Sequence, residues 1–216
     1  MHEWGPFFAV ETHPARATPT APWRPFRELV DEPARLAERV SGIQAYLAAG
    51  GGRPARRVAE SVTHLGLVAR LVSPTLRLAA LSGEFPVLDL DEVWWQPELG
   101  GTFPLSTHYG ADGSPDALVN GPLWTLTSAF AGSATVLWGN VASAINGAAT
   151  MIATTRPDLA CRAHALADQL LATPPLRGTS VREPDGRFRR RSCCLIYLAA
   201  PTPSRAAVCG DCVLAR

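Results

Sequence analysis

The chain has 216 residues, of which 47% are apolar and 18% charged, a composition typical of a folded protein with a sizeable core and unlike that of a disordered chain. Its formal net charge of +1 provides no global field to attract nucleic acid, so no nucleic-acid partner is expected. The first residues lack the basic and apolar regions of a secretory signal, so we expect a cytoplasmic protein, free or peripheral to the inner membrane, whose thiols stay reduced.

An irregular arm and a first helix are predicted for the first fifty residues. Residues 1–25 are rich in proline and threonine and have no hydrophobic period, which favours an arm without regular structure. Apolar residues then recur at helical spacing over residues 36–47. Asp31 is the expected N-cap of this helix, Pro33 lies in its first turn, and the glycines at 50–52 end it.

A second helix is predicted from about Pro54 to the residue before Pro74, with valines and leucines on one face. Pro74 is expected to end it, because proline removes a backbone hydrogen bond and clashes with the preceding turn. The shorter apolar stretch that follows, residues 75–81, could add one or two more helical turns. His64 lies on the apolar side of this helix. It is interpreted as a core histidine with a satisfied hydrogen bond, in preference to a ligand or a base.

The middle of the chain predicts a small β element. Residues 85–95 alternate in part between apolar and polar, and residues 100–109 combine threonine, phenylalanine, leucine and tyrosine between glycines. Both stretches are interpreted as short strands of a hairpin or small sheet. Asp112 and Gly113 form a dipeptide typical of a turn.

Helices return in the second half of the chain. They are predicted in a segment that Pro122 opens, over residues 134–154, and from Pro157 to the prolines at 174–175. Residues 117–155 contain no charged side chain, a span long enough for a membrane helix. The asparagines, serines and threonines within this span would lack partners in lipid, which favours buried core helices and no membrane span.

Together these elements predict one α+β domain that is mainly α-helical. An N-terminal arm (residues 1–25) precedes a helical body with a small central β element (residues 26–176). A C-terminal segment (residues 177–216) follows, and it contains four of the five cysteines. No internal repeat of fixed period is found in the sequence.

The four cysteines of the C-terminal segment lie within twenty residues: Cys193, Cys194, Cys209 and Cys212. In a reducing compartment, four clustered thiols indicate a structural zinc or an iron–sulfur cluster. A thioredoxin-like pair would use only Cys209 and Cys212 and would need a helix after them, for which few residues remain. The adjacent Cys193 and Cys194 suit a two-iron cluster slightly better than zinc, and spacing alone leaves both open. The fifth cysteine, Cys161, lies in an apolar helix and is interpreted as a small buried residue.

The tail also resembles that of a known family. The sequence RRSCCLIY at residues 190–197, followed by CGDC at residues 209–212, resembles the C-terminal signature of the FhuF-type ferric-siderophore reductases. LWGNVAS at residues 137–143 is similar to the central helix of that family. Fourteen residues separate Cys194 from Cys209, which is longer than the family's usual spacer. Because loop-closure entropy rises slowly with length, the longer spacer should still permit metal binding.

The resemblance implies that all four cysteines bind a [2Fe–2S] cluster and that the protein is an oxidoreductase acting on metal ions. The implied reaction is one-electron reduction of a ferric siderophore, which releases Fe²⁺ because siderophores bind Fe²⁺ far more weakly than Fe³⁺. The expected electron donor is a ferredoxin-like protein or an NAD(P)H-dependent reductase. Two alternatives stay open: a zinc-stabilised binding domain without redox activity, and an iron–sulfur electron carrier that serves another protein.

Five further residues are candidates for docking a substrate or partner. Arg189, Arg190 and Arg191 could offset thiolate charge, dock an acidic electron donor or contact siderophore oxygens, or they could form a solvated basic face. Trp138 and Asn140 could line a siderophore pocket or serve the core of the protein.

Overall fold

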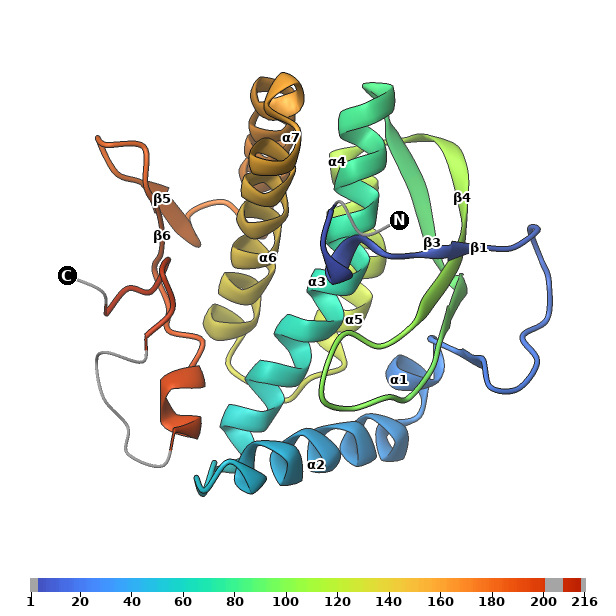
Figure 1. Ribbon diagram of the computed structural model, residues 1–216, viewed down its shortest axis with the longest axis vertical. Coiled ribbons are helices and arrows are strands. Elements are labelled where there is room, and N and C mark those ends of the chain that lie inside the picture. Colours follow the sequence, from blue (N-terminus) through green and yellow to red (C-terminus); the bar gives the residue numbers. More distant parts are fainter. Residues whose placement is uncertain (1–3, 201–207, 215–216) are drawn as a thin grey trace.

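Two long helices, α3 (Arg56–Ser82) and α6 (Ala134–Thr155), pack against each other at the centre of the protein (Figure 1). The computed structural model describes residues 4–200 and 208–214. Helix α7 (Ala160–Ala172) packs on α6, and α2 (Pro33–Ala49) packs on α3. Helices make up 52% of the structure and strands 15%, so the predicted α+β fold, mainly α-helical, is confirmed.

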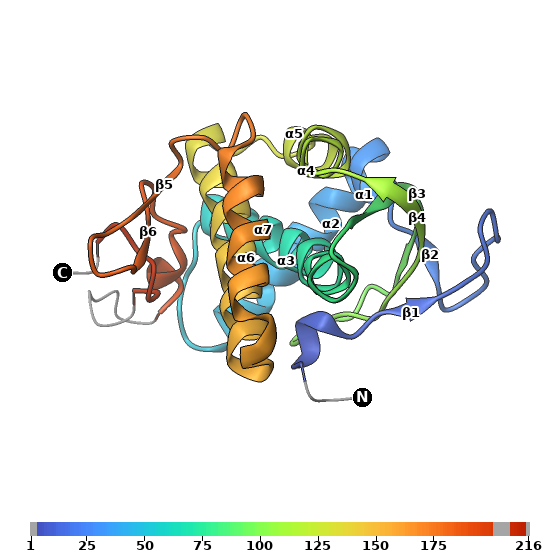
Figure 2. The same cartoon turned by 90° about the horizontal axis from the view of Figure 1, so that it is seen from above.

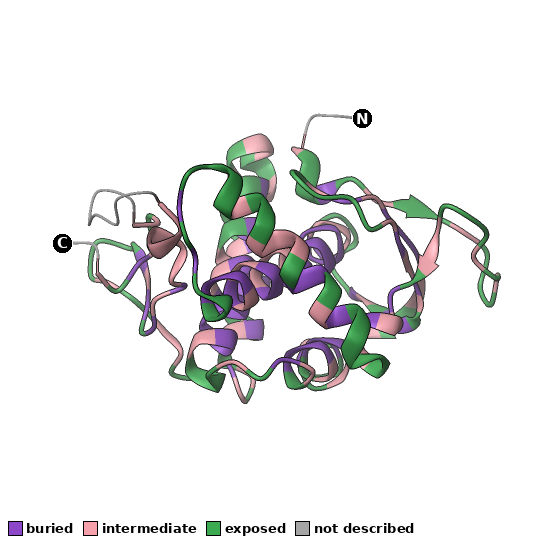
Figure 3. Ribbon diagram, turned by 90° about the horizontal axis from the view of Figure 1, so that it is seen from below, coloured by how far each residue is buried: buried purple, intermediate pink, exposed green. Residues whose placement is uncertain are grey.

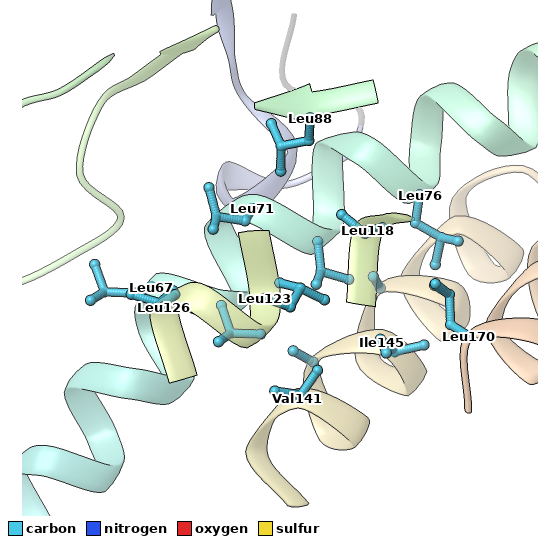
Figure 4. Close-up of a cluster of buried hydrophobic side chains, with 14 of the residues drawn as sticks. Leu67, Leu71, Leu76, Leu88, Leu118, Leu123, Leu126, Val141, Ile145 and Leu170 are labelled. Atoms are coloured by element: carbon cyan, nitrogen blue, oxygen red, sulfur yellow. The ribbon is translucent and has the colours of Figure 1, made fainter. Parts of the chain in front are cut away.

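The core lies where these helices face one another, and Figure 3 shows the buried residues gathered there. Leucines 67, 71 and 76 of α3 and the side chains of Val141 and Ile145 of α6 are fully or almost fully buried (Figure 4). Full burial of one such side chain contributes roughly 2 kcal/mol relative to exposure. The contact between α3 and α6 is therefore expected to supply much of the stability of the fold.

Helix α3 continues through Pro74, so the prediction that a helix ends before this proline is wrong. The apolar residues that follow, among them Leu76 and Ala79, are fully buried. Their burial offsets the ~3 kcal/mol that a proline costs inside a helix. The helix ends instead at Ser82, and the following Gly83 has a φ of 90°, the left-handed conformation common at helix C-termini.

A four-stranded sheet packs beside the helices (Figure 2). Its strand order is β1–β4–β3–β2, with β1 (Glu11–Thr12), β2 (Arg24–Pro25), β3 (Phe85–Trp95) and β4 (Leu105–Gly113). The antiparallel pair β3–β4 is the predicted small β element. Asp112 and Gly113 belong to β4, however, so the turn predicted there is wrong: the two strands are joined through residues 96–104.

The N-terminal arm is more ordered than its composition predicts. It supplies both edge strands of the sheet, since β1 pairs in parallel with β4 and β2 pairs antiparallel with β3. It also forms a 3-10 helix, Pro6–Phe8. The buried side chain of Arg70 on α3 donates hydrogen bonds to the backbone oxygens of Phe7 and Ala9, each over 2.7 Å. The prediction of an irregular arm is therefore wrong in part, because a distant arginine fixes the arm.

Several predicted helix ends are shifted. A short helix, α1 (Glu28–Asp31), precedes α2, so Asp31 ends α1 and Glu32 takes the N-cap position of α2. Before α6 the chain forms α4 (Pro115–Leu118), a π-helical turn (Val119–Leu123) and α5 (Trp124–Ser128). Pro122 lies within the π-helical turn and does not open a helix. The two helices predicted after it are confirmed as α6 and α7.

The C-terminal segment packs beside α6, on the side away from the four-stranded sheet (Figure 2). It begins with an antiparallel hairpin of β5 (Ser180–Arg182) and β6 (Phe188–Arg190) and continues to a 3-10 helix, Ile196–Ala199. Strand β6 contacts α6, and the 3-10 helix contacts α3. Both central helices therefore support the segment that contains the cysteine cluster.

Helices α3 and α6 are long and apolar enough to cross a membrane, judged by length and composition. Within each, 61% of the most apolar stretch is buried inside the protein. This degree of burial is what the core helices of a soluble protein show, in agreement with the core helices expected for residues 117–155.

Candidate metal centre

The four cysteine sulfurs of the C-terminal segment meet in two pairs. Cys194 Sγ lies 3.7 Å from Cys209 Sγ, and Cys193 Sγ lies 3.9 Å from Cys212 Sγ. Both distances exceed the ~2.05 Å of a disulfide bond, and all four thiols are free. They match instead the edge of a tetrahedron with metal–sulfur bonds of ~2.3 Å, an edge of about 3.8 Å. Each pair thus has the spacing of two ligands on one tetrahedral metal.

The sulfurs do not gather around a single point. Within residues 4–200 and 208–214, no group of three or more histidine, cysteine, aspartate or glutamate side chains is arranged to hold one metal ion. The fifth cysteine, Cys161, is exposed, so the prediction that it is buried is wrong. Ala163, Leu166 and Leu170 occupy the buried face of α7, and the helical period turns Cys161 toward solvent.

The backbone next to two of the cysteines points N–H groups at their sulfurs. Leu195 N donates to Cys193 Sγ over 3.3 Å, and Leu214 N donates to Cys212 Sγ over 3.4 Å. Leu195 adopts a left-handed conformation with φ of 66°, which is strained for a residue with a branched side chain. Because N–H donors stabilise negative charge on sulfur, this turn favours thiolates at the centre.

Burial and pairing give the four thiols different acidities. Cys194 and Cys212 are buried, whereas Cys193 and Cys209 are partly exposed. A hydrogen bond from Cys209, followed by one from the Ile196 backbone and by the charge of Arg190, lowers the pKa of Cys194 to about 6. The same pairing raises the pKa of Cys209, and burial raises that of Cys193. One thiolate is therefore expected at Cys194 at neutral pH, and thiolate is the form that binds metals.

Gly139 lets the C-terminal segment approach α6 closely. A Cβ atom at this position would overlap Ser192 Oγ and would lie 3.0 Å from Nη2 of Arg190. Ser192 immediately precedes the first cysteine, so any side chain at Gly139 would push the cysteine pair away from the helix. This close approach gives a physical reason for the glycine in the LWGNVAS sequence.

The next two polar residues of α6 hold the segment in place. Asn140 Oδ1 accepts a hydrogen bond from Arg190 Nη2 over 2.7 Å. Ser143 Oγ donates a hydrogen bond to the carboxylate of Asp211, between Cys209 and Cys212 in sequence. The Arg190 backbone N–H in turn donates to the backbone oxygen of Asp211 (2.9 Å). One face of α6 therefore fixes both halves of the cysteine cluster.

Helix α3 also holds the cysteine segment in place. Ser61 Oγ donates to the backbone oxygen of Cys194 over 2.8 Å. Asn140 Nδ2 donates to Ser61, over 3.0 Å to its backbone oxygen and 3.1 Å to its hydroxyl. His64 lies next to this network, fully buried, with Nε2 3.1 Å from Thr127 Oγ1. The prediction that His64 is a core histidine with a satisfied hydrogen bond is confirmed.

The three arginines before the cysteines have different positions. Arg190 is only 1% exposed, so it does not offer the docking surface predicted from the sequence. Arg189 forms an ion pair with Glu183 over 3.0 Å at the surface of the hairpin. Arg191 is exposed. Of the three, Arg189 and Arg191 are therefore the ones that a partner could contact.

The two α6 residues that were candidates to line a siderophore pocket are buried. Asn140 has no exposed surface, and its amide is hydrogen-bonded to Ser61 and Arg190. It therefore has a structural role and does not contact a ligand as predicted. Trp138 is 9% exposed and packs against Trp124, with 5.8 Å between ring centroids. Trp138 therefore belongs to the core, and Asn140 holds the C-terminal segment against it.

Sequence reasoning missed Ser61 of α3 and Ser143 of α6, which contact the cysteine segment. Ser61 lies 133 residues from Cys194, the residue it contacts, and a lone serine in a helix gives no signal of that contact. Both contacts depend on how α3 and α6 pack beside the C-terminal segment. No family model, curated protein or solved structure matches the chain.

Proposed function

We propose that the protein reduces ferric siderophore complexes by one electron in the cytoplasm and so releases Fe²⁺. A [2Fe–2S] cluster held by Cys193, Cys194, Cys209 and Cys212 would supply the electron. The observation that carries this proposal is the arrangement of the sulfurs in two pairs, 3.7 and 3.9 Å apart. A two-iron cluster takes two cysteines on each iron, whereas zinc takes all four around one ion.

The polar groups near the cysteines also fit a cluster. Two backbone N–H groups point at Cys193 and Cys212. Arg190 Nε, Arg190 Nη1 and Ser192 Oγ are buried and find no hydrogen-bond partner within the described part of the chain. Buried donors without partners favour an anionic group beside them, and a [2Fe–2S] cluster with four thiolate ligands carries net negative charge. The resemblance of residues 190–197 and 209–212 to the siderophore reductases supports the same cofactor.

When bound, such a cluster accepts and donates one electron at a time. Cys194 and Cys212 would anchor it from the buried side, and the partly exposed Cys193 and Cys209 would keep it near the surface. An electron donor and a bulky chelate can both approach a site of this kind. The siderophore's Fe³⁺ gains the electron, and its hard oxygen ligands bind the resulting Fe²⁺ weakly. No nucleophile or general acid is required of the protein.

Arg191 is the residue best placed to meet a charged partner, because it is exposed and follows directly on the buried Arg190. An acidic electron donor, such as a ferredoxin-like protein, would be attracted by this charge. Arg189 is less available, because Glu183 already pairs with it.

The proposal is tested with protein purified without oxygen and reduced with dithionite. Mixing it with a ferric hydroxamate siderophore in the presence of an Fe²⁺ chelator should reoxidise the protein and trap one Fe²⁺ per electron transferred. Cys209→Ser should lose the visible absorbance and the reaction, because it removes one ligand of a sulfur pair. Cys161→Ser is the matched control, since Cys161 is exposed on α7 and should leave both unchanged.

Three results would contradict the proposal in different ways. Colourless protein with one zinc per chain would point to a zinc-stabilised domain. Protein that bleaches with dithionite, but that no ferric chelate reoxidises, would point to an electron carrier. Equal loss of absorbance in Cys161→Ser and Cys209→Ser would mean that the paired sulfurs are not the ligands.

A further inference from the structure

The side chain of Arg190 is buried beside the cysteines with part of its hydrogen-bonding capacity unused. Its Nη2 donates to Asn140 Oδ1 over 2.7 Å and to the backbone oxygen of Val136 over 3.4 Å. Its Nε and Nη1 find no hydrogen-bond partner among the described residues. A buried cation is costly unless an anion lies near it, so this arrangement calls for negative charge at the site.

No carboxylate of the described chain supplies that charge through an ion pair with Arg190. The neighbouring Arg189 does have such a partner, Glu183, over 3.0 Å. Asp211 contacts Arg190 through its backbone oxygen, while its carboxylate accepts a hydrogen bond from Ser143. The other anionic groups of the site are the cysteine thiolates: Arg190 Nη2 and the hydroxyl of Ser192, the residue before Cys193, both lie within 3.0 Å of the position that a Cβ atom of Gly139 would take.

Asn140 keeps the guanidinium of Arg190 in place. The Asn140 amide forms hydrogen bonds on both sides: Oδ1 accepts one from Arg190, and Nδ2 donates one to Ser61. Ser61 in turn donates a hydrogen bond to the backbone oxygen of Cys194. All three side chains that form this chain of contacts are buried. The distance between the guanidinium and the cysteine pair is therefore fixed by hydrogen bonds from both central helices.

We propose that Arg190 is the fixed counter-charge of the metal centre, a positioning residue that raises the reduction potential of the bound cluster. This inference rests on the proposed function. Reduction adds one electron and no proton, so the centre gains one negative charge. A cation in a low-dielectric interior stabilises the more negative, reduced form more than the oxidised form. Surface arginines such as Arg189 and Arg191 are screened by water and should have little effect.

The test is a redox titration of the anaerobic holoprotein, followed by visible absorbance. Arg190→Gln removes the charge and should shift the midpoint potential to more negative values. We expect at least a tenfold drop in the equilibrium constant for reduction, which corresponds to about 59 mV for a one-electron couple. Arg190→Lys keeps the charge, so its midpoint potential should lie close to that of the unmodified protein. Arg189→Gln is the matched control and should stay close to the unmodified protein.

Asn140→Asp provides a second route if Arg190→Gln does not fold. Its carboxylate has nearly the shape of the amide and would lie 2.7 Å from Nη2 of Arg190, the present length of the hydrogen bond to Asn140 Oδ1. The new anion would cancel the positive charge without removing the arginine, so the potential should again become more negative. An unchanged potential in folded, fully loaded Arg190→Gln or Asn140→Asp would overturn the proposal.

Three outcomes separate the possible causes. Equal shifts in Arg190→Lys and Arg190→Gln would also overturn the inference, because they would mean that the shape of arginine matters and its charge does not. If the unmodified protein takes up no iron–sulfur cluster, the proposed function fails. If it takes up the cluster and the midpoint potential does not change in the Arg190 variants, only the proposed role of Arg190 as counter-charge is rejected.

Discussion

Gly139 determines how closely the cysteine segment approaches α6. Its missing side chain leaves room for Ser192 Oγ and for the guanidinium of Arg190. The adjacent Asn140 then reaches Arg190, and Ser143, one turn further along, reaches Asp211. These three α6 residues act together, because the two hydrogen bonds depend on the close approach that the glycine permits.

Gly139→Ala should therefore destabilise the protein and weaken the metal centre. An added methyl group in a packed contact costs about 1–3 kcal/mol, which urea unfolding of the metal-free protein would measure. Iron content after reconstitution should fall as well. Gly147→Ala on the same helix is the control, because its added Cβ meets nothing within 4 Å. That variant should gain about 0.5–1 kcal/mol, and equal stability of the two variants would contradict this interpretation of Gly139.

His64 should make the fold sensitive to mild acid. Burial, and next the charge of Arg190, lowers the pKa of His64 from 6.5 to about 3. The unfolded chain therefore takes up a proton near pH 6.5 while the folded chain does not. The stabilisation is complete above pH 6.5 and is lost as the pH falls toward 3, by about 2 kcal/mol at pH 5.

The pH effect is measured by denaturant unfolding at pH 7 and pH 5. The unmodified protein should lose about 2 kcal/mol more between these two values than His64→Gln, which has no titrating ring. If both proteins lose the same stability, His64 is not the group that titrates.

At the level of elements, α3 illustrates what a local pattern can and cannot predict. Its first half was predictable, because valines and leucines recur on one face and the flanking residues mark its start. Its continuation through Pro74 was not, because a proline normally ends a helix and only the tertiary burial of Leu76 and Ala79 outweighs that cost. The order of the N-terminal arm was not predictable for a similar reason: it depends on Arg70, more than sixty residues away.

The half of α3 beyond Pro74 should contribute strongly to stability. Leu76→Ala removes a fully buried side chain and should cost about 2–5 kcal/mol in urea unfolding. Leu81 lies on the same half of the helix but is 47% exposed. The variant Leu81→Ala should therefore lose less than about 0.5 kcal/mol of unfolding free energy. Similar, small losses in both variants would indicate that the helix does not continue through Pro74 into the core.

For the whole molecule, the candidate centre joins parts of the chain that lie far apart in sequence. The four cysteines were identifiable from their clustering, because four thiols within twenty residues indicate metal ligands in a chain that is expected in a reducing compartment. Their division into two pairs and their attachment through Ser61 of α3 and Asn140 of α6 were not, since these contacts depend on how the helices pack. The choice between iron and zinc depends on that pairing.

The most direct test is electron paramagnetic resonance of the anaerobically purified, dithionite-reduced protein, combined with metal analysis. If Cys193 with Cys212 and Cys194 with Cys209 bind one iron each, the protein contains two irons per chain, the content of a [2Fe–2S] cluster. One-electron reduction should then give about one unpaired spin per chain, since a two-iron cluster takes up a single electron. Protein that contains one zinc per chain and gives no spin signal would contradict the two-iron centre.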